Sequence, residues 1–477
     1  MESATSAPRL HRNIWYMGAK ARVIPGFLAR VMDAELDPGR TAVDLMCGSG
    51  VVSAYLADKY RVYANDVQLY SSVIARSLVE HDPSTVAAFL ASLNPRDDLG
   101  REYRRNFRRL ERHYDLALSE ESRLLDAYGA LGRGAWTGAR GAAWAGEYRE
   151  FLQNTAGVYP GGDGPAGRSR NVYREAACLL TESSIRGRRQ DPSRRPAFLV
   201  TTYYSNIYFG LRQAVQIDSL RAAIDALDPG PFSEEKRVHY LSALLHAASV
   251  TTSGTSHFAQ PRDLRKDSEL RALAKRRSLD VLEVLEEYSR EIAETVGNSS
   301  YQKGNKVFQV DYGDLIQRDG SFKFPAGVDL VYLDPPYTAD NYSRFYHVLE
   351  VIARYDYPEL DRDPTGAILK GRYPAIDERF RSNFCRRGRV EDEFRRVIQA
   401  SARSGAKLVI SYAYPTGLLL KTYAQSAQQG EPLERFQNLC REAYQNVRLL
   451  RRPMMHSGQG DSNLRVEELL VVCKEPR

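Results

Sequence analysis

Residues 41–56 read TAVDLMCGSGVVSAYL. The first part, 41–46, is a short apolar run typical of a buried strand, and it ends at Cys47-Gly48-Ser49-Gly50, where glycines permit a tight turn. Helix-compatible residues resume over 51–56. A strand, a glycine turn and a helix in this order predict the start of a doubly wound α/β sheet.

The rest of the predicted sheet lies in two separate parts of the chain. A second strand, 61–64, ends at Asn65-Asp66 and precedes a helical stretch over 71–80. Apolar, partly β-branched runs that fit buried strands return only late, at 306–310, 328–333, 407–411 and 467–472. Arg-rich helical patterns fill the region between them. We therefore predict one α/β domain, 1–85 and 301–477, interrupted by a mostly helical insertion, 86–300.

Composition narrows the class of protein. The 477 residues carry 67 Lys and Arg against 60 Asp and Glu, and the net charge of +7 fits a polyanionic partner but equally a solubility role. The five cysteines show no C-x-x-C spacing, so neither a zinc site nor a disulfide framework is indicated. No run reaches the roughly 18 apolar residues of a membrane span, and the N-terminal residues lack a secretory apolar core. We expect a cytoplasmic protein with no metal and no membrane partner.

The second informative stretch is Val331-Tyr332-Leu333-Asp334-Pro335-Pro336-Tyr337, where an apolar strand runs into a carboxylate, two prolines and an aromatic ring. Each proline lacks an N–H and fixes φ, which stiffens the turn and leaves carbonyls free as acceptors. The Asp334 carboxylate and the Pro335 carbonyl would accept both N–H groups of a planar amine. Tyr337 would stack a base that has left the duplex. The alternative is a stiff surface turn without catalytic function.

Four residues around the first strand are candidates for binding a ligand: Asp44, Cys47, Gly48 and Gly50. Ser53 stands where the third glycine of a dinucleotide fingerprint would fall, so a nucleoside such as S-adenosylmethionine fits better than a nicotinamide cofactor. Asp66, at the end of the second strand, is placed to accept hydrogen bonds from a ribose diol. An ordinary helix N-cap is the competing interpretation of Asp66.

Three further residues are weaker candidates for the same ligand. In Trp15-Tyr16-Met17-Gly18-Ala19-Lys20, Tyr16 would pack on the cofactor and Lys20 would meet its carboxylate. Asp311, after the strand that precedes the catalytic one, would accept the cofactor's adenine amine. A surface turn and a solvated acidic loop are the respective alternatives.

Taken together, 16–20, 44–50, Asn65-Asp66 and Asp334 to Tyr337 resemble the Dam-like adenine-specific DNA methyltransferases. In that family cofactor motifs come first, a recognition insertion follows, and the catalytic tetrapeptide comes late. The resemblance implies a Rossmann-like class I methyltransferase sheet, mixed but mostly parallel, with helices on both faces. It also implies that Tyr16, Lys20, Asp66 and Asp334 bind S-adenosylmethionine and that Asp334-Pro335-Pro336-Tyr337 is the catalytic loop. Cys47 stands where the family usually has an aromatic residue.

The expected function is site-specific methyl transfer from S-adenosylmethionine to the N6 amine of adenine in double-stranded DNA, by base flipping and direct in-line displacement. Cys47 then has no nucleophilic role. The insertion would recognise the target sequence, and a cognate restriction or defence nuclease is a partner that the sequence leaves open. Three segments resemble a bacterial branch of the family without an assignable role: 203–214, 256–260 and 342–347.

Clustered arginines are the candidates for DNA contact. The run with Gly and Pro within it is our preferred DNA-binding loop, and its residues are Arg186, Arg188, Arg189, Arg194 and Arg195. The run from Arg101 to Arg112 contains Glu102 and Glu111, so a solvated helix face is as good an interpretation as a DNA surface.

Two other functions remain open at this stage. The same two acceptors would serve a planar amine in RNA or on a protein side chain, although protein glutamine methylation more often pairs with Asn than with Asp at the first position. The second alternative is a catalytically inactive nucleic-acid-binding component of a defence system. An intact Asp334 argues against it.

Overall fold

The computed structural model describes residues 20, 23–131, 136, 138–155, 198–253, 257–300, 304–426, 430–454 and 466–477. The chain forms two compact units. The sheet unit comprises Met1–Leu90, Ala293–Tyr342 and Phe380–Arg477, and the helical unit comprises Ala91–Ile292 and Ser343–Arg379. The segment 343–379 therefore belongs with the helices, whereas the division expected from the sequence keeps 301–477 together. Within the described ranges, no helix has the length and apolarity to cross a membrane.

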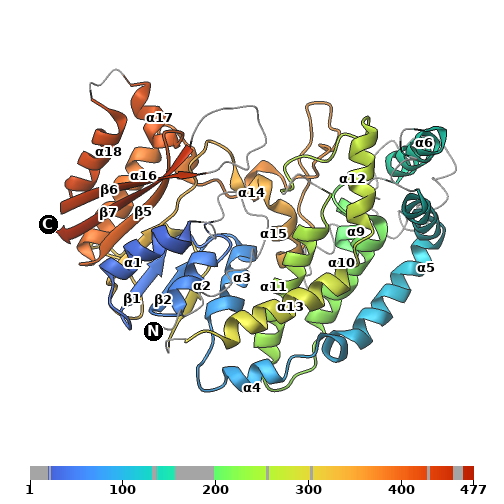
Figure 1. The fold of residues 1–477 in the computed structure, drawn as a ribbon, viewed down its shortest axis with the longest axis horizontal. Coiled ribbons are helices and arrows are strands. Elements are labelled where there is room, and N and C mark those ends of the chain that lie inside the picture. Colours follow the sequence, from blue (N-terminus) through green and yellow to red (C-terminus); the bar gives the residue numbers. More distant parts are fainter. Residues whose placement is uncertain are drawn as a thin grey trace, which may run out of the picture. The chain divides into compact units, whose positions relative to one another are not determined.

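A seven-stranded sheet forms the sheet unit (Figure 1), in the order β3-β2-β1-β4-β5-β7-β6. The first five strands in this order are parallel, and β7 is antiparallel to both β5 and β6. The strands are β1 Thr41–Asp44, β2 Arg61–Asn65, β3 Lys306–Phe308, β4 Leu330–Leu333, β5 Lys407–Tyr414, β6 Tyr444–Met454 and β7 Val466–Pro476. The predicted mixed, mostly parallel α/β sheet is confirmed, with β6 as an additional strand at the edge.

Helices cover both faces of this sheet. Alternate strand residues such as Val43, Val331 and Ile410 pack in one apolar core with α16–α18, while α2 and α3 pack on the opposite face. The helices of the sheet unit are α1 Ala29–Glu35, α2 Val51–Ala57, α3 Leu69–Val79, α16 Val390–Arg403, α17 Leu418–Ala424 and α18 Pro432–Arg441. A π-helical turn, Ile24–Leu28, leads into α1. The layered arrangement follows from the period of two along buried strands.

The strand order places a switch point between β1 and β4. From β1 the chain winds outward to β2 and β3, whereas β4 and β5 lie on the other side of β1. Open α/β sheets bind ligands at the carboxyl ends of the strands beside such a point. Asp44 ends β1 and Asp334 follows β4, and Asp44 is in register with Tyr332. Two predicted site residues thus lie at the edge where a ligand is expected.

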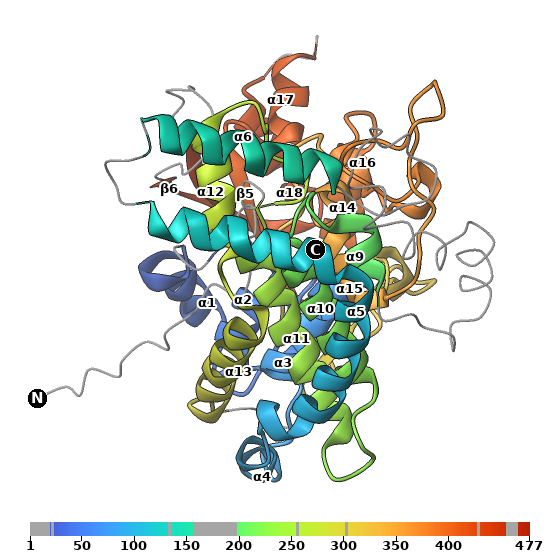
Figure 2. The same cartoon turned by 90° about the vertical axis from the view of Figure 1, so that its right-hand side faces the viewer.

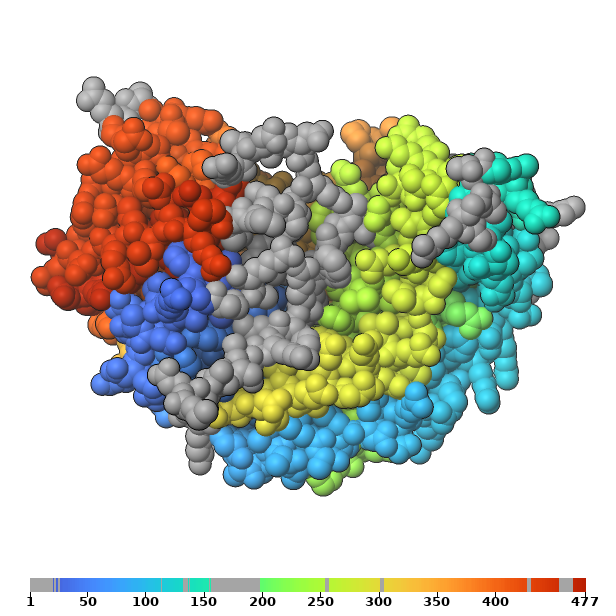
Figure 3. Space-filling view, viewed as in Figure 1, coloured from blue at the N-terminus to red at the C-terminus, as the bar shows by residue number. Residues whose placement is uncertain are grey.

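The first and last segments of the sheet unit meet through a buried carboxylate. Figure 3 shows the N-terminal segment, in blue, packed against the C-terminal strands, in red. Glu35, at the end of α1, is 4% exposed and forms ion pairs with Lys407 of β5, Arg448 of β6 and Lys474 of β7. Their N–O distances are 3.6, 3.3 and 2.8 Å. One carboxylate therefore ties α1 to three strands.

The helical unit is built around α10 Leu211–Asp225, most of whose side chains are buried. Asp218 accepts hydrogen bonds from the Val200 and Thr201 backbones at 2.9 and 2.8 Å and from the Tyr355 hydroxyl at 2.7 Å. The Arg221 guanidinium donates to the carbonyl of Ile352 at 3.1 Å. Because buried polar groups need partners, these contacts fix α10 against α9 and α15.

Six further helices surround α10 or extend from it: α5 Pro95–Ala130, α6 Ala139–Asn154, α9 Leu199–Tyr204, α11 Ser233–Thr251, α12 Asp267–Arg277 and α15 His347–Arg354. α4 Val86–Ala91, α13 Val281–Gly297 and α14 Tyr342–Phe345 span the limits of the two units. Figure 2 shows α5 and α6 side by side, and the Trp144 indole of α6 donates to the Leu124 carbonyl of α5 at 2.8 Å. The described part of this region is mostly helical, as predicted.

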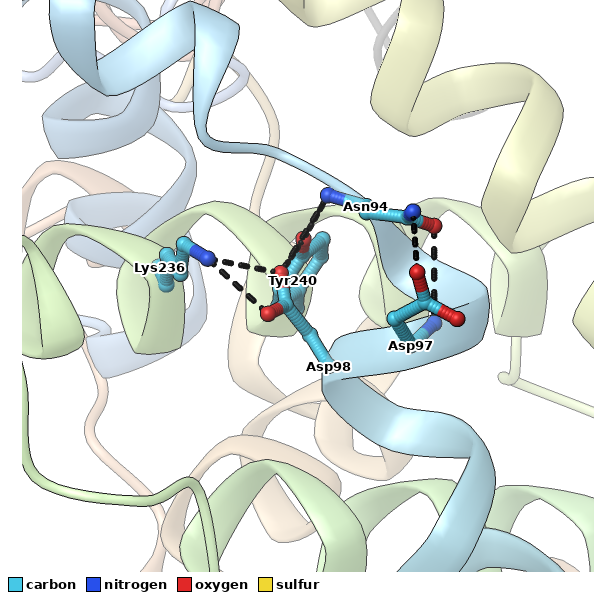
Figure 4. Close-up of polar contacts among 5 residues, drawn as sticks. All are labelled: Asn94, Asp97, Asp98, Lys236 and Tyr240. Carbon is cyan, nitrogen blue, oxygen red and sulfur yellow. Dashed lines mark hydrogen bonds and ion pairs between the residues drawn. The ribbon is translucent and has the colours of Figure 1, made fainter.

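The start of α5 is held by a polar cluster (Figure 4). The Asn94 side chain caps the helix by accepting from the Asp97 N–H at 3.4 Å. Lys236 of α11 lies 2.9 Å from both oxygens of Asp98, and the Tyr240 hydroxyl donates to Asp98 as well. Carboxylates in a first helical turn also interact favourably with the helix dipole. The cluster anchors a 36-residue helix at its N-terminus.

The segments without an assignable role meet in one buried cluster of the helical unit. The Tyr208 hydroxyl donates to the carbonyls of Phe258 and Gly371, at 2.6 and 3.0 Å, and the Phe258 N–H donates to the Phe345 carbonyl at 2.8 Å. His347 lies 3.1 Å from the same Gly371 carbonyl through Nε2. These motif residues therefore hold 343–379 in the helical unit, which is a structural role.

Candidate active site

The loop after β1 takes backbone conformations that favour glycine. Gly48 and Gly50 have φ of 51° and 71°. A Cβ atom at Gly50 would lie 3.2 Å from both the Ala75 Cα and the Leu78 Cδ1 of α3. Glycine at these positions lets the loop turn tightly and lets α2 begin close to α3.

Asp66 joins this loop to the end of β2. Its Oδ2 accepts a hydrogen bond from the Gly48 backbone N–H at 3.0 Å, and its Oδ1 accepts from the Gln68 N–H at 2.9 Å. The N-cap residue of α3 is Gln68, so Asp66 is not an ordinary helix N-cap. Its carboxylate instead fixes the glycine loop relative to the neighbouring strand.

Asp44 is a buried carboxylate beneath the loop. It is 1% exposed, and its Oδ2 accepts from the Ser53 hydroxyl at 2.6 Å. Its Oδ1 has no hydrogen-bond partner among the described residues. Burial raises the pKa of Asp44 to about 7, and the charges of Asp334 and Asp66 add to this rise. A buried oxygen without a donor is costly, so a ligand N–H or O–H would find an acceptor here.

Cys47 lies inside the loop and is buried. Its backbone N–H donates to the Asn65 carbonyl at 2.8 Å. Burial, together with the charges of Asp66 and Asp44, raises the pKa of the thiol well above its usual range. A protonated thiol is a weak nucleophile, which agrees with the expectation that Cys47 takes no covalent part in the reaction.

Lys20 lies between two carboxylates from distant parts of the sequence. Its Nζ is 3.1 Å from Asp334 Oδ1, at the end of β4, and 3.0 Å from Glu468 Oε1, on β7. Lys20 and Glu468 are almost completely buried, and the Asp334 side chain is 20% exposed. Burial opposes the charge of Lys20, but Asp334 and Glu468 outweigh it and hold the pKa of Lys20 well above its usual range.

The same arrangement sets the charge of Asp334. Burial raises the pKa of Asp334 to about 6, the Lys20 ammonium lowers it, and the Glu468 carboxylate raises it. The Ser411 hydroxyl of β5 donates a hydrogen bond to Glu468. Near neutral pH this site therefore holds a carboxylate that is close to its titration range, beside one cation and a second carboxylate.

The rest of the tetrapeptide is fixed at the same sheet edge. The Tyr337 carbonyl accepts from the Leu418 N–H at 2.9 Å, and the Tyr337 ring centroid is 5.8 Å from Lys20 Nζ. Among the described residues, no N–H or hydroxyl donates to the Pro335 carbonyl. The turn thus carries two acceptors, the Asp334 carboxylate and the Pro335 carbonyl, and a partly buried ring beside them.

Asp311 lies at the same edge of the sheet but in a local contact. Its side chain accepts from the Gly313 N–H at 2.8 Å and caps the short 3₁₀ turn Tyr312–Leu315. The neighbouring Val310 exchanges hydrogen bonds with the Asn65 side chain, at 3.2 and 3.3 Å. Asp311 therefore follows a segment that is tied to the end of β2, and its role toward a cofactor stays a prediction.

Tyr16 and the five arginines between Arg186 and Arg195 lie outside the described residues. The sequence reasoning missed Glu468 and Ser411, which complete the surroundings of Lys20. The available signal was a carboxylate directly before an apolar run, Glu468-Leu-Leu-Val-Val. Its partner could not be read from the sequence, because β7 pairs with β5 only through the sheet topology.

Comparison with known proteins agrees with this geometry. The chain is 24% identical over 386 residues to modification methylase LlaI of Lactococcus lactis subsp. lactis, a match over 80% of this chain and 44% of that protein. It is 25% identical over 257 residues to type II methyltransferase M.FokI of Planomicrobium okeanokoites, over 53% and 34% of the two chains. For M.NlaIII of Neisseria lactamica the identity is 28% over 194 residues, over 40% and 47%. The chain thus spans less than half the length of each of these relatives.

A family match covers the residues that build the site. It extends over 16–128 and 204–369, more than half of the chain, and includes Lys20, the glycine loop, Asp66 and Asp334 to Tyr337. Glu468 and Ser411 lie outside the matched residues. With the strand order and the positions of these residues at the switch point, the match establishes that the chain belongs to the D12 class N6 adenine-specific DNA methyltransferases.

Proposed function

We propose that this protein transfers a methyl group from S-adenosylmethionine to the N6 amine of adenine at specific sites in double-stranded DNA. One observation carries the proposal: the Asp334 carboxylate follows β4 beside the glycine loop of β1, at the switch point of the sheet. A planar amine and a nucleoside cofactor would be bound next to each other there. Membership of an N6-adenine family selects adenine among planar amines.

The residues around β1 and β2 fit S-adenosylmethionine. The Gly48 and Gly50 conformations permit close approach of the backbone to a nucleoside, and the unpartnered Asp44 Oδ1 is a buried acceptor. Asp66 would accept from the ribose hydroxyls, and Tyr16, Lys20 and Asp311 are the further predicted contacts. Cys47 would contribute its backbone. When bound, the cofactor supplies an electrophilic methyl group on its sulfonium.

The catalytic turn would act on the acceptor amine. Its lone pair is delocalised into the adenine ring, so nucleophilic attack requires the nitrogen to rehybridise. Asp334 and the Pro335 carbonyl would accept its two N–H groups and favour that geometry. Positive charge develops on the nitrogen as the methyl group transfers, and an ionised Asp334 stabilises that charge. Pro336 stiffens the turn, and Tyr337 would stack a base flipped from the duplex.

A basic face on α5 supports DNA as the substrate. Six arginines between 101 and 112 are exposed, on the side of α5 opposite its buried residues such as Leu110 and Tyr114. Arg101 and Arg105 form ion pairs with Asp228 and Glu102. The other four, Arg104, Arg108, Arg109 and Arg112, form no ion pair with any described residue. Free guanidinium groups along a helix suit DNA phosphates.

The relatives named modification methylases favour a role beside a restriction nuclease. We therefore include a cognate restriction or defence nuclease as a proposed partner, and we propose that the protein is cytoplasmic. The arginines of the 186–195 run remain proposed DNA contacts.

Transfer of labelled methyl from S-adenosylmethionine tests the function. We expect label in the N6 position of adenine in duplex DNA, and none with Asp334→Ala. Label found only in RNA or protein would show that the methyl acceptor is not DNA and would overturn the proposed substrate. Cofactor and DNA binding without transfer by the wild-type chain would indicate an inactive binding component.

A further inference from the structure

We propose that Glu468 is a positioning residue for methyl transfer: it shares the Lys20 ammonium with Asp334 and thereby holds the Asp334 carboxylate available to the acceptor amine. The assignment rests on the proposed function and adds a residue to it. Glu468 lies on β7, near the C-terminus, outside the part of the chain that matches the family.

The sheet geometry directs Glu468 to the site. Leu469 and Val471 of β7 pack in the core beneath α16–α18, so Glu468 faces the opposite side of the sheet. Ser411 of β5 lies on that same side and pairs in register with Leu470, two residues from Glu468. A direct hydrogen bond joins the Ser411 hydroxyl to Glu468. The antiparallel direction of β7 brings its first residues to the carboxyl edge of β5.

Burying the Glu468 carboxylate costs desolvation free energy, which its contacts must offset. Glu468 is 2% exposed, and it is the third residue of β7, directly before the buried apolar run 469–473. A buried charge must be paired and hydrogen-bonded to avoid a large desolvation cost. Its ion pair is with Lys20, at 3.0 Å, and Lys20 also contacts Asp334, at 3.1 Å. The cation is thus divided between the two carboxylates.

This division has a chemical consequence for Asp334. With Glu468 absent, Lys20 would have Asp334 as its one carboxylate partner in this cluster and would compete with the amine for it. With Lys20 absent, two carboxylates would face each other in a buried site, which favours protonation of one of them. Glu468 and Lys20 together therefore keep Asp334 ionised, while Asp334 shares the Lys20 ammonium with Glu468 and stays available to the amine. The groups that surround Asp334 are Lys20, Glu468, Ser411, Tyr332, Tyr337 and Asp44.

The test is the pH dependence of kcat/KM for methyl transfer to duplex DNA by the full chain. The wild-type acid limb should follow Asp334, whose pKa is raised to about 6. Removing the Glu468 charge takes away a repulsion, so Glu468→Gln should move this limb to lower pH and reduce kcat at neutral pH by roughly 10- to 100-fold, equivalent to about 1.4–3 kcal/mol. The dissociation constant for S-adenosylmethionine should change less than about twofold.

Glu467→Gln is the matched control. Glu467 is the adjacent carboxylate on β7 and is paired at 3.6 Å with Arg451. Its replacement should leave the acid limb and kcat unchanged. Glu468→Asp keeps the charge and should return the limb to the wild-type position. Lys20→Met tests the cluster from the other side and should move the limb to higher pH.

Two results would overturn the assignment alone. If Glu468→Gln lowers thermal stability and activity together while the acid limb stays in place, Glu468 is only structural. If Glu468→Gln does not fold, an unshifted limb in Lys20→Met has the same meaning. A wild-type chain that transfers no methyl to DNA would overturn the proposed function and, with it, this assignment. Failure of the assignment alone is recognised because the wild-type chain is then active.

Discussion

The Asp66 carboxylate accepts a hydrogen bond of 3.0 Å from the Gly48 backbone N–H, so the residue after β2 holds the glycine loop after β1. Asp66→Ala should remove this hydrogen bond and the proposed acceptor for the ribose together. Hydrogen bonds to charged groups contribute about 1.5–3 kcal/mol, so we expect S-adenosylmethionine affinity to fall roughly 10- to 100-fold. Calorimetric titration with the cofactor measures this.

Asp66→Asn is the informative companion to that variant. It keeps an acceptor for the Gly48 N–H but loses the negative charge, so its affinity should lie between those of the wild type and Asp66→Ala. Equal affinity for all three proteins would remove Asp66 from the cofactor site. Unfolding temperatures measured without cofactor distinguish the two causes of weaker binding. A lowered temperature indicates a damaged loop, and an unchanged temperature indicates the loss of the acceptor for the cofactor.

Most of the sheet could be predicted from the sequence because buried parallel strands are continuous apolar runs. The run over 41–46 and the one over 328–333 correspond to β1 and β4, each within a few residues. The strand β6 was missed for a physical reason. It lies at the sheet edge and carries Arg448, Arg451, Arg452 and Pro453, so it lacks the apolar pattern of a buried strand.

The sequence predicts those site residues that lie near the end of a predicted strand, but not the contacts that depend on which strands pair. Asp44, Asp66 and Asp334 each lie near the end of a predicted strand, and parallel strands place these ends at one edge of the sheet. The ion pairs of Lys20 depend instead on where residue 20 lies and on how β7 pairs with β5. No local pattern around Glu468 encodes either fact.

Cys47 provides a test of direct transfer. The thiol is buried, and its raised pKa keeps it protonated at neutral pH. Cys47→Ala should therefore keep methyl transfer within a fewfold of the wild-type rate, since the loop uses the Cys47 backbone N–H rather than its side chain. Single-turnover kinetics measures the rate. A variant that binds cofactor normally but transfers no methyl group would contradict in-line displacement without a covalent intermediate.

Glu35 should contribute to stability and not to catalysis. Removing one partner of a buried ion pair costs about 3–5 kcal/mol. The three cations around Glu35 are partly exposed and would regain water, so Glu35→Gln should lower the free energy of unfolding by roughly 1–3 kcal/mol. Urea denaturation measures this. Glu80→Gln, which breaks the surface pair with Arg76, is the control and should cost less than about 1 kcal/mol.

Asp44 should make stability depend on pH. Burial raises its pKa to about 7, whereas an unfolded Asp titrates at about 3.9. The folded state therefore binds the proton more tightly than the unfolded state does. The stability that protonated Asp44 contributes is complete below its unfolded pKa and is lost as pH rises through about 7.

Asp44→Asn removes this titration. The free energy of unfolding of the wild type minus that of the variant should fall by about 2–3 kcal/mol between about pH 5 and pH 8. Asp37→Asn, in the exposed turn before β1, should show no such trend. A difference that rises with pH would mean that Asp44 is ionised and stabilised in the free protein.

The basic face of α5 makes a prediction about salt. Removal of one arginine that binds a phosphate should reduce the slope of log affinity against log salt by about 1. Arg108→Gln combined with Arg112→Gln should therefore lower the slope for duplex DNA by about 2 and weaken binding at low salt. Fluorescence anisotropy over a salt series measures both quantities.

Arg105→Gln combined with Arg123→Gln is the matched control on the same helix, with the same change in net charge. Arg105 pairs with Glu102, and Arg123 pairs with Glu120 and Glu147. Because these guanidinium groups are already engaged by carboxylates, their removal should change the slope much less. Equal slopes for the two double variants would mean that DNA responds only to net charge, and α5 would then be a solvated helix face rather than a phosphate-contacting surface.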